Sequence, residues 1–148
     1  MNKRQLTLAA TAAVLTTMVG VGGALAHHAF SAEFDGKAPV NLRGKVTKVE
    51  WINPHAWVHL DHVTKTGTQK WMVEGGTPNT LLRSGINRNS LKAGTEIVVR
   101  GYQSKDRLCE PICKANGRDV TFPDGRKLFM GSSGTGAPKD GSDPVDKK

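Results

Sequence analysis

Residues 40–64 read VNLRGKVTKVEWINPHAWVHLDHVT, and this stretch decides the fold class. Small or apolar residues alternate with polar ones at positions 40, 42, 44 and 46, after which the pattern changes phase to Val49 and Trp51. An alternation with period two predicts a strand with one buried face. A phase change in a glycine-containing strand predicts a β-bulge and a strong bend. Asn53 and Pro54 then predict a short connection to a second strand.

The second strand has two rows of side chains on opposite faces. We expect the mainly aliphatic row to face the core: Ala56, Val58, Leu60 and His62. The other row is expected to face outward: His55, Trp57, His59 and Asp61. Since His62 belongs to the aliphatic row, it is predicted to be a hydrogen-bonded histidine of the core or of a sheet edge.

The next segments predict a third strand and a short helix. In QKWMVE (residues 69–74), the inward positions are Trp71 and Val73, and the outward ones are Lys70, Met72 and Glu74. In TPNTLLRSG (residues 77–85), Thr77 is the expected N-cap and Pro78 the first helical residue, with Leu81 and Leu82 directed inward. Gly85 is expected to end this helix.

The remaining strands complete a small barrel. Residues 90–102 (SLKAGTEIVVRGY) predict a turn and a fourth strand that buries Ile97 and Val99, and residues 118–130 predict a hairpin around Pro123, Asp124 and Gly125. The order of elements predicts an all-β domain with one short helix, namely a small OB-like Greek-key β-barrel of five to six strands over residues 38–130. A half-open sheet packed on the helix is the alternative. Neither fold fixes a function.

The chain begins like a secreted protein. Lys3 and Arg4 precede an apolar run, and Ala24-Leu25-Ala26 is a small-x-small cleavage site, so residues 1–26 are predicted to be a cleaved signal peptide. An uncleaved membrane anchor is the alternative. Cleavage leaves 122 of the 148 residues, lowers the formal charge from +8 to +6 and predicts a periplasmic or secreted protein without a membrane span. Residues 27–37 form an N-terminal segment, and residues 131–148 are expected to be disordered.

Five segments carry a resemblance to a known family. They are HHAFSAEFD (27–35), VTKVEWINPHAWVHLD (46–61), VEGGTPNTLLRSG (73–85), SLKAGTEIVVRGY (90–102) and DVTFPDGRKLFMGSSGTGAP (119–138). Together they resemble a family of small exported bacterial proteins known only as a domain of unknown function. The resemblance extends from His27 to about Pro138. It implies an exported single-domain protein and brings no activity with it.

The histidines indicate a metal site. Cleavage after Ala26 makes His27 the first residue, and its α-amine and ring Nδ1 can chelate one ion. One further imidazole completes a T-shaped histidine brace, a set of nitrogen ligands that suits copper(II). Four strand residues span about 13 Å, so one ion does not readily bind both His55 and His59. We select His55, beside the Asn53-Pro54 connection, with His59 as the alternative.

Two further side chains are candidate metal ligands, and the site has a simpler explanation. His28 adjoins the chelating residue, and the outward Met72 is a candidate soft ligand for copper(I). A histidine after a cleavage site can also be a residue that the peptidase merely tolerates. Copper binding is therefore an expectation that depends on where the chain is cut.

Other residues support different interpretations. Trp57 is a candidate stacking platform for a base or sugar ring, helped by Lys45, Lys48 or Arg100, or a tryptophan covered by a loop or the N-terminal segment. Cys109 and Cys113 are predicted to form a local disulfide in an oxidising compartment, with a redox or thiolate-metal role as the secondary interpretation. The sequence contains no recognisable catalytic constellation.

The first hypothesis is therefore a monomeric periplasmic copper-binding module that acts in metal handling, with a metal ion and a periplasmic protein as partners. Nucleic acid is not an expected partner because the positive charge is spread along the chain. A metal-free ligand-binding or protein-interaction domain that uses the Trp57 face is the second hypothesis. An oxidative copper enzyme is the third.

Overall fold

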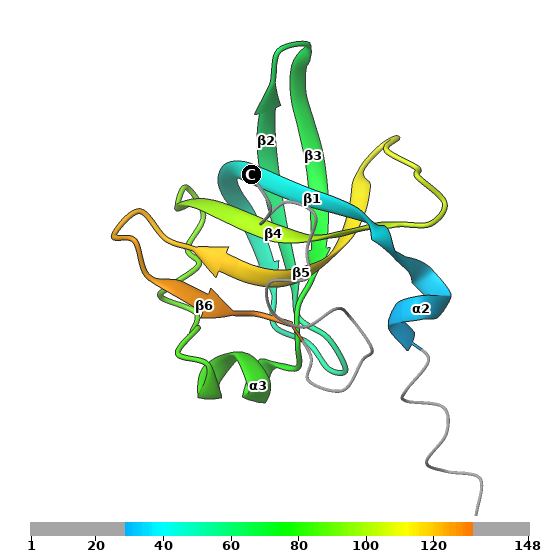
Figure 1. Ribbon diagram of the computed structural model, residues 1–148. Coiled ribbons are helices and arrows are strands. Elements are labelled where there is room, and N and C mark those ends of the chain that lie inside the picture. Colours follow the sequence, from blue (N-terminus) through cyan, green and yellow to red (C-terminus); the bar gives the residue numbers. More distant parts are fainter. Residues whose placement is uncertain (1–28, 132–148) are drawn as a thin grey trace, which may run out of the picture.

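The computed structural model describes residues 29–131, which form two short helices and six strands (Figure 1). In chain order these are α2 (Ala29–Glu33), β1 (Phe34–Glu50), β2 (Trp57–Thr64), β3 (Gly67–Glu74), α3 (Pro78–Arg83), β4 (Glu96–Ser104), β5 (Cys113–Thr121) and β6 (Lys127–Phe129). Neither of these helices has the length and apolar character needed to span a bilayer. The predicted signal peptide, His27, His28 and all of the predicted tail except Gly131 lie outside the described residues.

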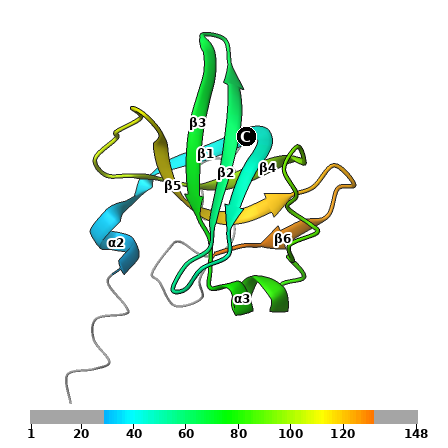
Figure 2. The same cartoon turned by 180° about the vertical axis from the view of Figure 1, so that it is seen from behind.

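Five of the strands close into a barrel. The strand order is β3-β2-β1-β4-β5, and a parallel pairing between β3 and β5 joins the two ends, while β6 extends the sheet beyond β5. α3 connects β3 to β4, and the β2–β3 hairpin extends well beyond the barrel (Figures 1 and 2). The closed barrel confirms the predicted small OB-like all-β fold and not the half-open sheet.

The first strand is long and bulged, as its phase change predicted. β1 pairs with β2 from Gly44 to Val46 and resumes at Lys48, which leaves Thr47 as the extra residue. β1 also pairs with β4 along Pro39 to Lys45, so one bent strand serves both neighbours. A Cβ on Gly44 would lie 2.3 Å from the carbonyl oxygen of Asp61, so the close approach of the two strands requires glycine there.

The barrel core consists of the residues at the inward positions of the strands. The predicted inward residues that are buried are Ala56, Val58, Leu60, Trp71, Val73, Ile97 and Val99. His62 is only half-buried at the edge of the core, and its Nδ1 lies 2.7 Å from the carbonyl oxygen of Arg43. The aliphatic row thus ends before His62, which makes the predicted hydrogen bond.

The helix after β3 has the predicted start but only one buried leucine. The side chain of Thr77 accepts a hydrogen bond from the backbone N–H of Thr80 at 3.1 Å, and Pro78 opens the helix. Leu81 is buried, whereas Leu82 is 54% exposed, so the prediction that both leucines face inward was wrong. A six-residue helix presents one narrow stripe to the core, and adjacent residues point in directions about 100° apart.

Two strands begin earlier than their patterns predicted. β1 starts at Phe34, where a bridge to Ser104 precedes the regular pairing, and β5 starts at Cys113 rather than Arg118. Residues 113–117 (CKANG) lack apolar alternation because Asn116 and Gly117 are buried without contributing apolar side chains to the core.

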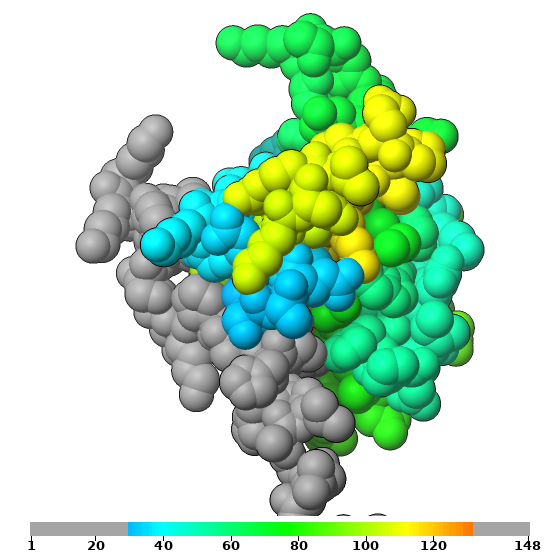
Figure 3. Space-filling view, turned by 90° about the vertical axis from the view of Figure 1, so that its right-hand side faces the viewer, coloured from blue at the N-terminus to red at the C-terminus, as the bar shows by residue number. Residues whose placement is uncertain are grey.

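A second, small aromatic core fixes α2 on the outside of the barrel. The ring of Phe30 meets the ring of Tyr102 edge-on, with centroids 5.5 Å apart, and lies 5.9 Å from the ring of Phe34. All three residues are buried and form a cluster separate from the barrel core. Figure 3 shows α2 in blue against the yellow-green chain that follows β4. The described chain therefore begins in a segment that is packed on the barrel.

Candidate functional site

A row of cross-strand partners crosses the outer face of the barrel. Trp57 of β2 is paired with Glu74 of β3, Glu74 with Asn116 of β5, and Asn116 with Tyr102 of β4. Because partners in neighbouring strands project to the same side of a sheet, these four side chains share one face. Phe30 of α2 covers the Tyr102 end of this row, so α2 lies beside the polar residues at its centre.

His55 lies at the other end of the row, two residues before the start of β2. The hydrogen bonds Ala56 N–H to Gly76 O (3.0 Å) and Gly75 N–H to Ala56 O (2.8 Å) hold its backbone against the end of β3. The Nδ1 atom of His55 lies 3.3 Å from the carbonyl oxygen of Gly75. A carbonyl oxygen only accepts hydrogen bonds, so this contact favours the tautomer with its proton on Nδ1 and its lone pair on Nε2.

Glu74 is a buried carboxylate beside this histidine. Its Oε1 lies 3.9 Å from Nδ1 of His55 and accepts a hydrogen bond of 3.1 Å from Nδ2 of Asn116. Glu74 was expected to face solvent, but it is only 8% exposed, because β5 pairs beside β3 and places the buried Asn116 against it. Burial raises the pKa of Glu74, and the neighbouring His55 and the Asn116 hydrogen bond oppose this increase.

Lys114 links α2 to the same face. Its ammonium group pairs with the carboxylate of Glu33 at the end of α2 and lies 5.1 Å from the ring centroid of Trp57. It also lies 6.0 Å from the ring centroid of Phe34. Trp57 is half-buried, and a cation already lies over its ring. Ring stacking of a ligand on Trp57 stays a prediction, and a ligand there would have to share the ring with Lys114.

His59 and Met72 lie in the adjacent row. They are cross-strand partners, and Met72 is paired with Lys114 on its other side. The Nε2 atom of His59 is buried and lies 3.3 Å from a carboxylate oxygen of Glu50. This carboxylate has a lowered pKa, chiefly through its hydrogen bond from Lys48, with His59 adding to the effect. The Nε2 atom of His59 is therefore shielded from solvent and lies beside a carboxylate. It is less accessible to a metal ion than an exposed imidazole nitrogen.

The two cysteines lie at disulfide distance, with their Sγ atoms 2.14 Å apart. Cys113 is the first residue of β5 and precedes Lys114. The bridge therefore closes the loop that leads directly into the strand with Lys114 and Asn116.

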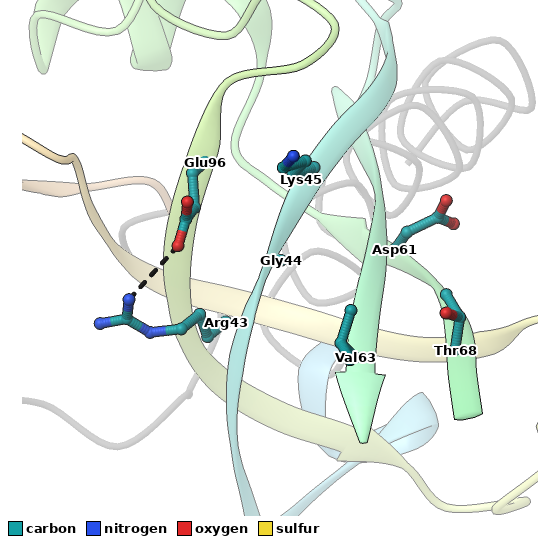
Figure 4. A pocket seen from close by; sticks show the side chains of 7 residues that line it. All are labelled: Arg43, Gly44, Lys45, Asp61, Val63, Thr68 and Glu96. Carbon is teal, nitrogen blue, oxygen red and sulfur yellow. Dashed lines mark hydrogen bonds and ion pairs between the residues drawn. The ribbon is translucent and has the colours of Figure 1, made fainter. Parts of the chain in front are cut away.

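A cavity of about 410 Å³ lies elsewhere, at the base of the β2–β3 hairpin (Figure 4). Its lining comes from four neighbouring strands and comprises Arg43, Gly44, Lys45, Asp61, Val63, Thr68 and Glu96. Arg43 and Glu96 point toward each other and form an exposed ion pair at 3.3 Å. Of the residues selected from the sequence, only Lys45, a suggested helper of Trp57, contributes to this cavity, so it is separate from the histidine site.

Within residues 29–131, no three histidine, cysteine or acidic side chains lie close enough together to hold a metal ion. The described part of the site supplies one accessible imidazole, His55, with a supporting carboxylate. The other proposed ligands, His27 and His28, precede Ala29 and lie outside the described residues. Glu74 and Asn116 were not selected from the sequence as site residues, since only the pairing of β3 with β5 brings them together.

A family model for proteins of unknown function matches residues 15–110. The chain belongs to the DUF6152 family. The DUF6152 match includes His27, His28, His55 and Glu74, and it ends before β5 and thus before Asn116. No curated protein matches the chain. The resemblance to a family without known activity is thereby confirmed, whereas export stays a prediction.

Proposed function

We propose that this protein is exported to the periplasm and binds one copper ion through the α-amine and ring of His27 and the Nε2 atom of His55. It acts in copper handling rather than in turnover. The observation that carries the proposal is the contact between Nδ1 of His55 and the carbonyl oxygen of Gly75, because this contact leaves Nε2 with the lone pair that a metal needs.

The position of α2 supports the partnership of His27 with His55. α2 begins at Ala29, and its Phe30 and Glu33 contact Tyr102 and Lys114, respectively, on the outer face that carries His55. His27 precedes Ala29 by only two positions in the sequence. Deprotonation of an α-amine and two imidazoles near pH 7 costs little free energy, so all three can bind a metal ion. Copper(II) has the highest affinity for such nitrogen ligands among the divalent first-row metal ions.

The test is a calorimetric titration of copper(II) into protein that begins at His27. We expect one tight site, which His55→Ala weakens by more than the roughly 10–100-fold that is typical of changes outside the ligand shell. His62→Gln is the matched control, because His62 lies farther along in β2 and its Nδ1 donates to the Arg43 carbonyl oxygen instead. His59→Ala tests the alternative ligand.

Wild-type affinity in His55→Ala would overturn the proposal. A loss confined to His59→Ala would transfer the third ligand to His59. Weak binding by every form would favour a metal-free ligand-binding or interaction domain.

A further inference from the structure

We propose that Glu74 and Asn116 are positioning residues of the copper site. Asn116 holds the Glu74 carboxylate, and Glu74 acts with the Gly75 carbonyl to keep His55 in the tautomer and orientation that present Nε2 to the ion. This inference rests on the proposed function and adds to it the residues that set the affinity of the site.

Asn116 contacts the carboxylate of Glu74. The two side chains are 3% and 8% exposed, and Nδ2 of Asn116 donates to Oε1 of Glu74 at 3.1 Å. A buried carboxylate without a donor carries a large desolvation cost, so the amide is both a partner and a restraint. The restrained atom, Oε1, is the one that faces His55.

The surroundings of Nδ1 of His55 favour one tautomer of the ring. Two acceptors surround this atom, the Gly75 carbonyl oxygen at 3.3 Å and Oε1 of Glu74 at 3.9 Å. A lone pair on Nδ1 would face two oxygen atoms, so these neighbours favour the ring with its proton on Nδ1. A histidine that donates to a carboxylate or carbonyl through one nitrogen is a fixed and more basic ligand through the other nitrogen.

The pairing of the strands brings His55, Glu74 and Asn116 together. Glu74 is the last residue of β3, and the parallel pairing with β5 places Asn116 beside it. This pairing is also the one that closes the barrel. Barrel closure therefore supplies the Asn116 restraint on Glu74, whereas the β2–β3 pairing brings Glu74 close to His55.

The experiment compares Glu74→Gln and Asn116→Ala with wild type. Glu74→Gln keeps the shape of the side chain and removes its charge, whereas Asn116→Ala removes the donor. Glu96→Gln and Asn41→Ala are matched controls at exposed positions on β4 and β1. Thermal unfolding of each metal-free variant establishes that it is folded before copper is added.

Two readouts separate positioning from a merely structural role. Long-range proton–nitrogen NMR of the metal-free protein reports the tautomer of His55, and copper(II) titration with EPR reports affinity and coordination. We expect the Nδ1-protonated tautomer in wild type and a mixture of tautomers in both variants, with copper affinity lowered by roughly 10–100-fold. The controls are expected to match wild type in both readouts.

Copper affinity and EPR spectra in both variants equal to those of wild type would overturn the proposal. In that case wild type still binds copper, so the proposed function stands. If wild type with an authentic His27 terminus binds no copper tightly, the proposed function fails and this role fails with it. The two failures are therefore distinguished by the wild-type titration alone.

Discussion

Oε1 of Glu74 lies 3.9 Å from Nδ1 of His55, although one residue ends β3 and the other precedes β2. The antiparallel pairing that ends with Trp57 opposite Glu74 creates this proximity. His55, Glu74 and Asn116 thus form a polar cluster on the outer face of a barrel whose inner face is apolar. The cluster lies next to α2, the first helix of the described chain.

Lys114→Met should loosen α2 from the barrel. The Lys114–Glu33 ion pair is partly exposed, so its loss should lower the free energy of unfolding by no more than about 1 kcal/mol. Hydrogen exchange in residues 29–37 should nevertheless become faster, and the fluorescence of Trp57 should change because the cation over its ring is gone. Hydrogen exchange followed by mass spectrometry measures the first effect.

The matched control is Lys70→Met, which removes an exposed lysine from β3, the strand that pairs with β5. Equal exchange in residues 29–37 for wild type and Lys114→Met would show that the aromatic cluster and the Lys105 hydrogen bonds hold α2 without Lys114.

Gly44→Ala should destabilise the barrel. A Cβ at this position would lie 2.3 Å from the Asp61 carbonyl oxygen and 2.7 Å from a methyl carbon of Leu60, so β1 and β2 must separate locally. We expect the free energy of unfolding in urea to fall by about 1–3 kcal/mol, as for other overpacked sites. Lys45→Ala, at the next position on β1, should change it by less than about 0.5 kcal/mol. Similar stabilities for the two variants would contradict the observed strand spacing.

Asp106→Asn should reduce stability at neutral pH and lose this effect in acid. The pKa of Asp106 is lowered, first by the Ser104 hydroxyl that donates to it at 2.7 Å and then by the Leu108 N–H at 3.1 Å, while Lys114 adds a smaller effect. A lowered pKa contributes stability that is present above the ordinary value of 3.8 and is lost as pH falls through the folded-state value.

The Tm of Asp106→Asn should therefore lie below that of wild type by a constant amount from pH 7 to about pH 4, and the difference should narrow below that. Circular dichroism melts at several pH values measure it. A Tm difference between wild type and Asp106→Asn that widens on acidification would contradict stabilisation by the ionised Asp106 carboxylate.

Local patterns in the sequence predicted the inward positions of the strands but not the buried polar residues Glu74 and Asn116. The alternation of Val58 and Leu60 and the phase change before Val49 predicted the buried face and the bulge, since both depend on neighbours along one strand. The same parity correctly assigned Glu74 to the outer face. Its burial could not be predicted, because it depends on Asn116, a residue brought in by a parallel pairing between distant strands.

The metal role of the histidines stays a prediction, and the structure gives only the surroundings of those it describes. The position of His55 beside the Asn53-Pro54 connection distinguished it from His59, and the structure gives the two residues different surroundings. The Gly75 carbonyl and the Lys114–Glu33 contact left no signal in the sequence, since backbone acceptors and long-range ion pairs have no fixed spacing. The role of His27 is still a prediction from the cleavage site.

Copper binding through the α-amine of His27 is tested most directly by adding one residue at the N-terminus. Copper(II) EPR and calorimetry would compare protein that starts at His27 with the same protein preceded by a single glycine. We expect one tight site with nitrogen hyperfine structure in the first protein. In the second protein we expect loss of tight binding and a changed spectrum, because the α-amine no longer belongs to the histidine. The same affinity and spectrum in both proteins would contradict copper binding through the α-amine of His27.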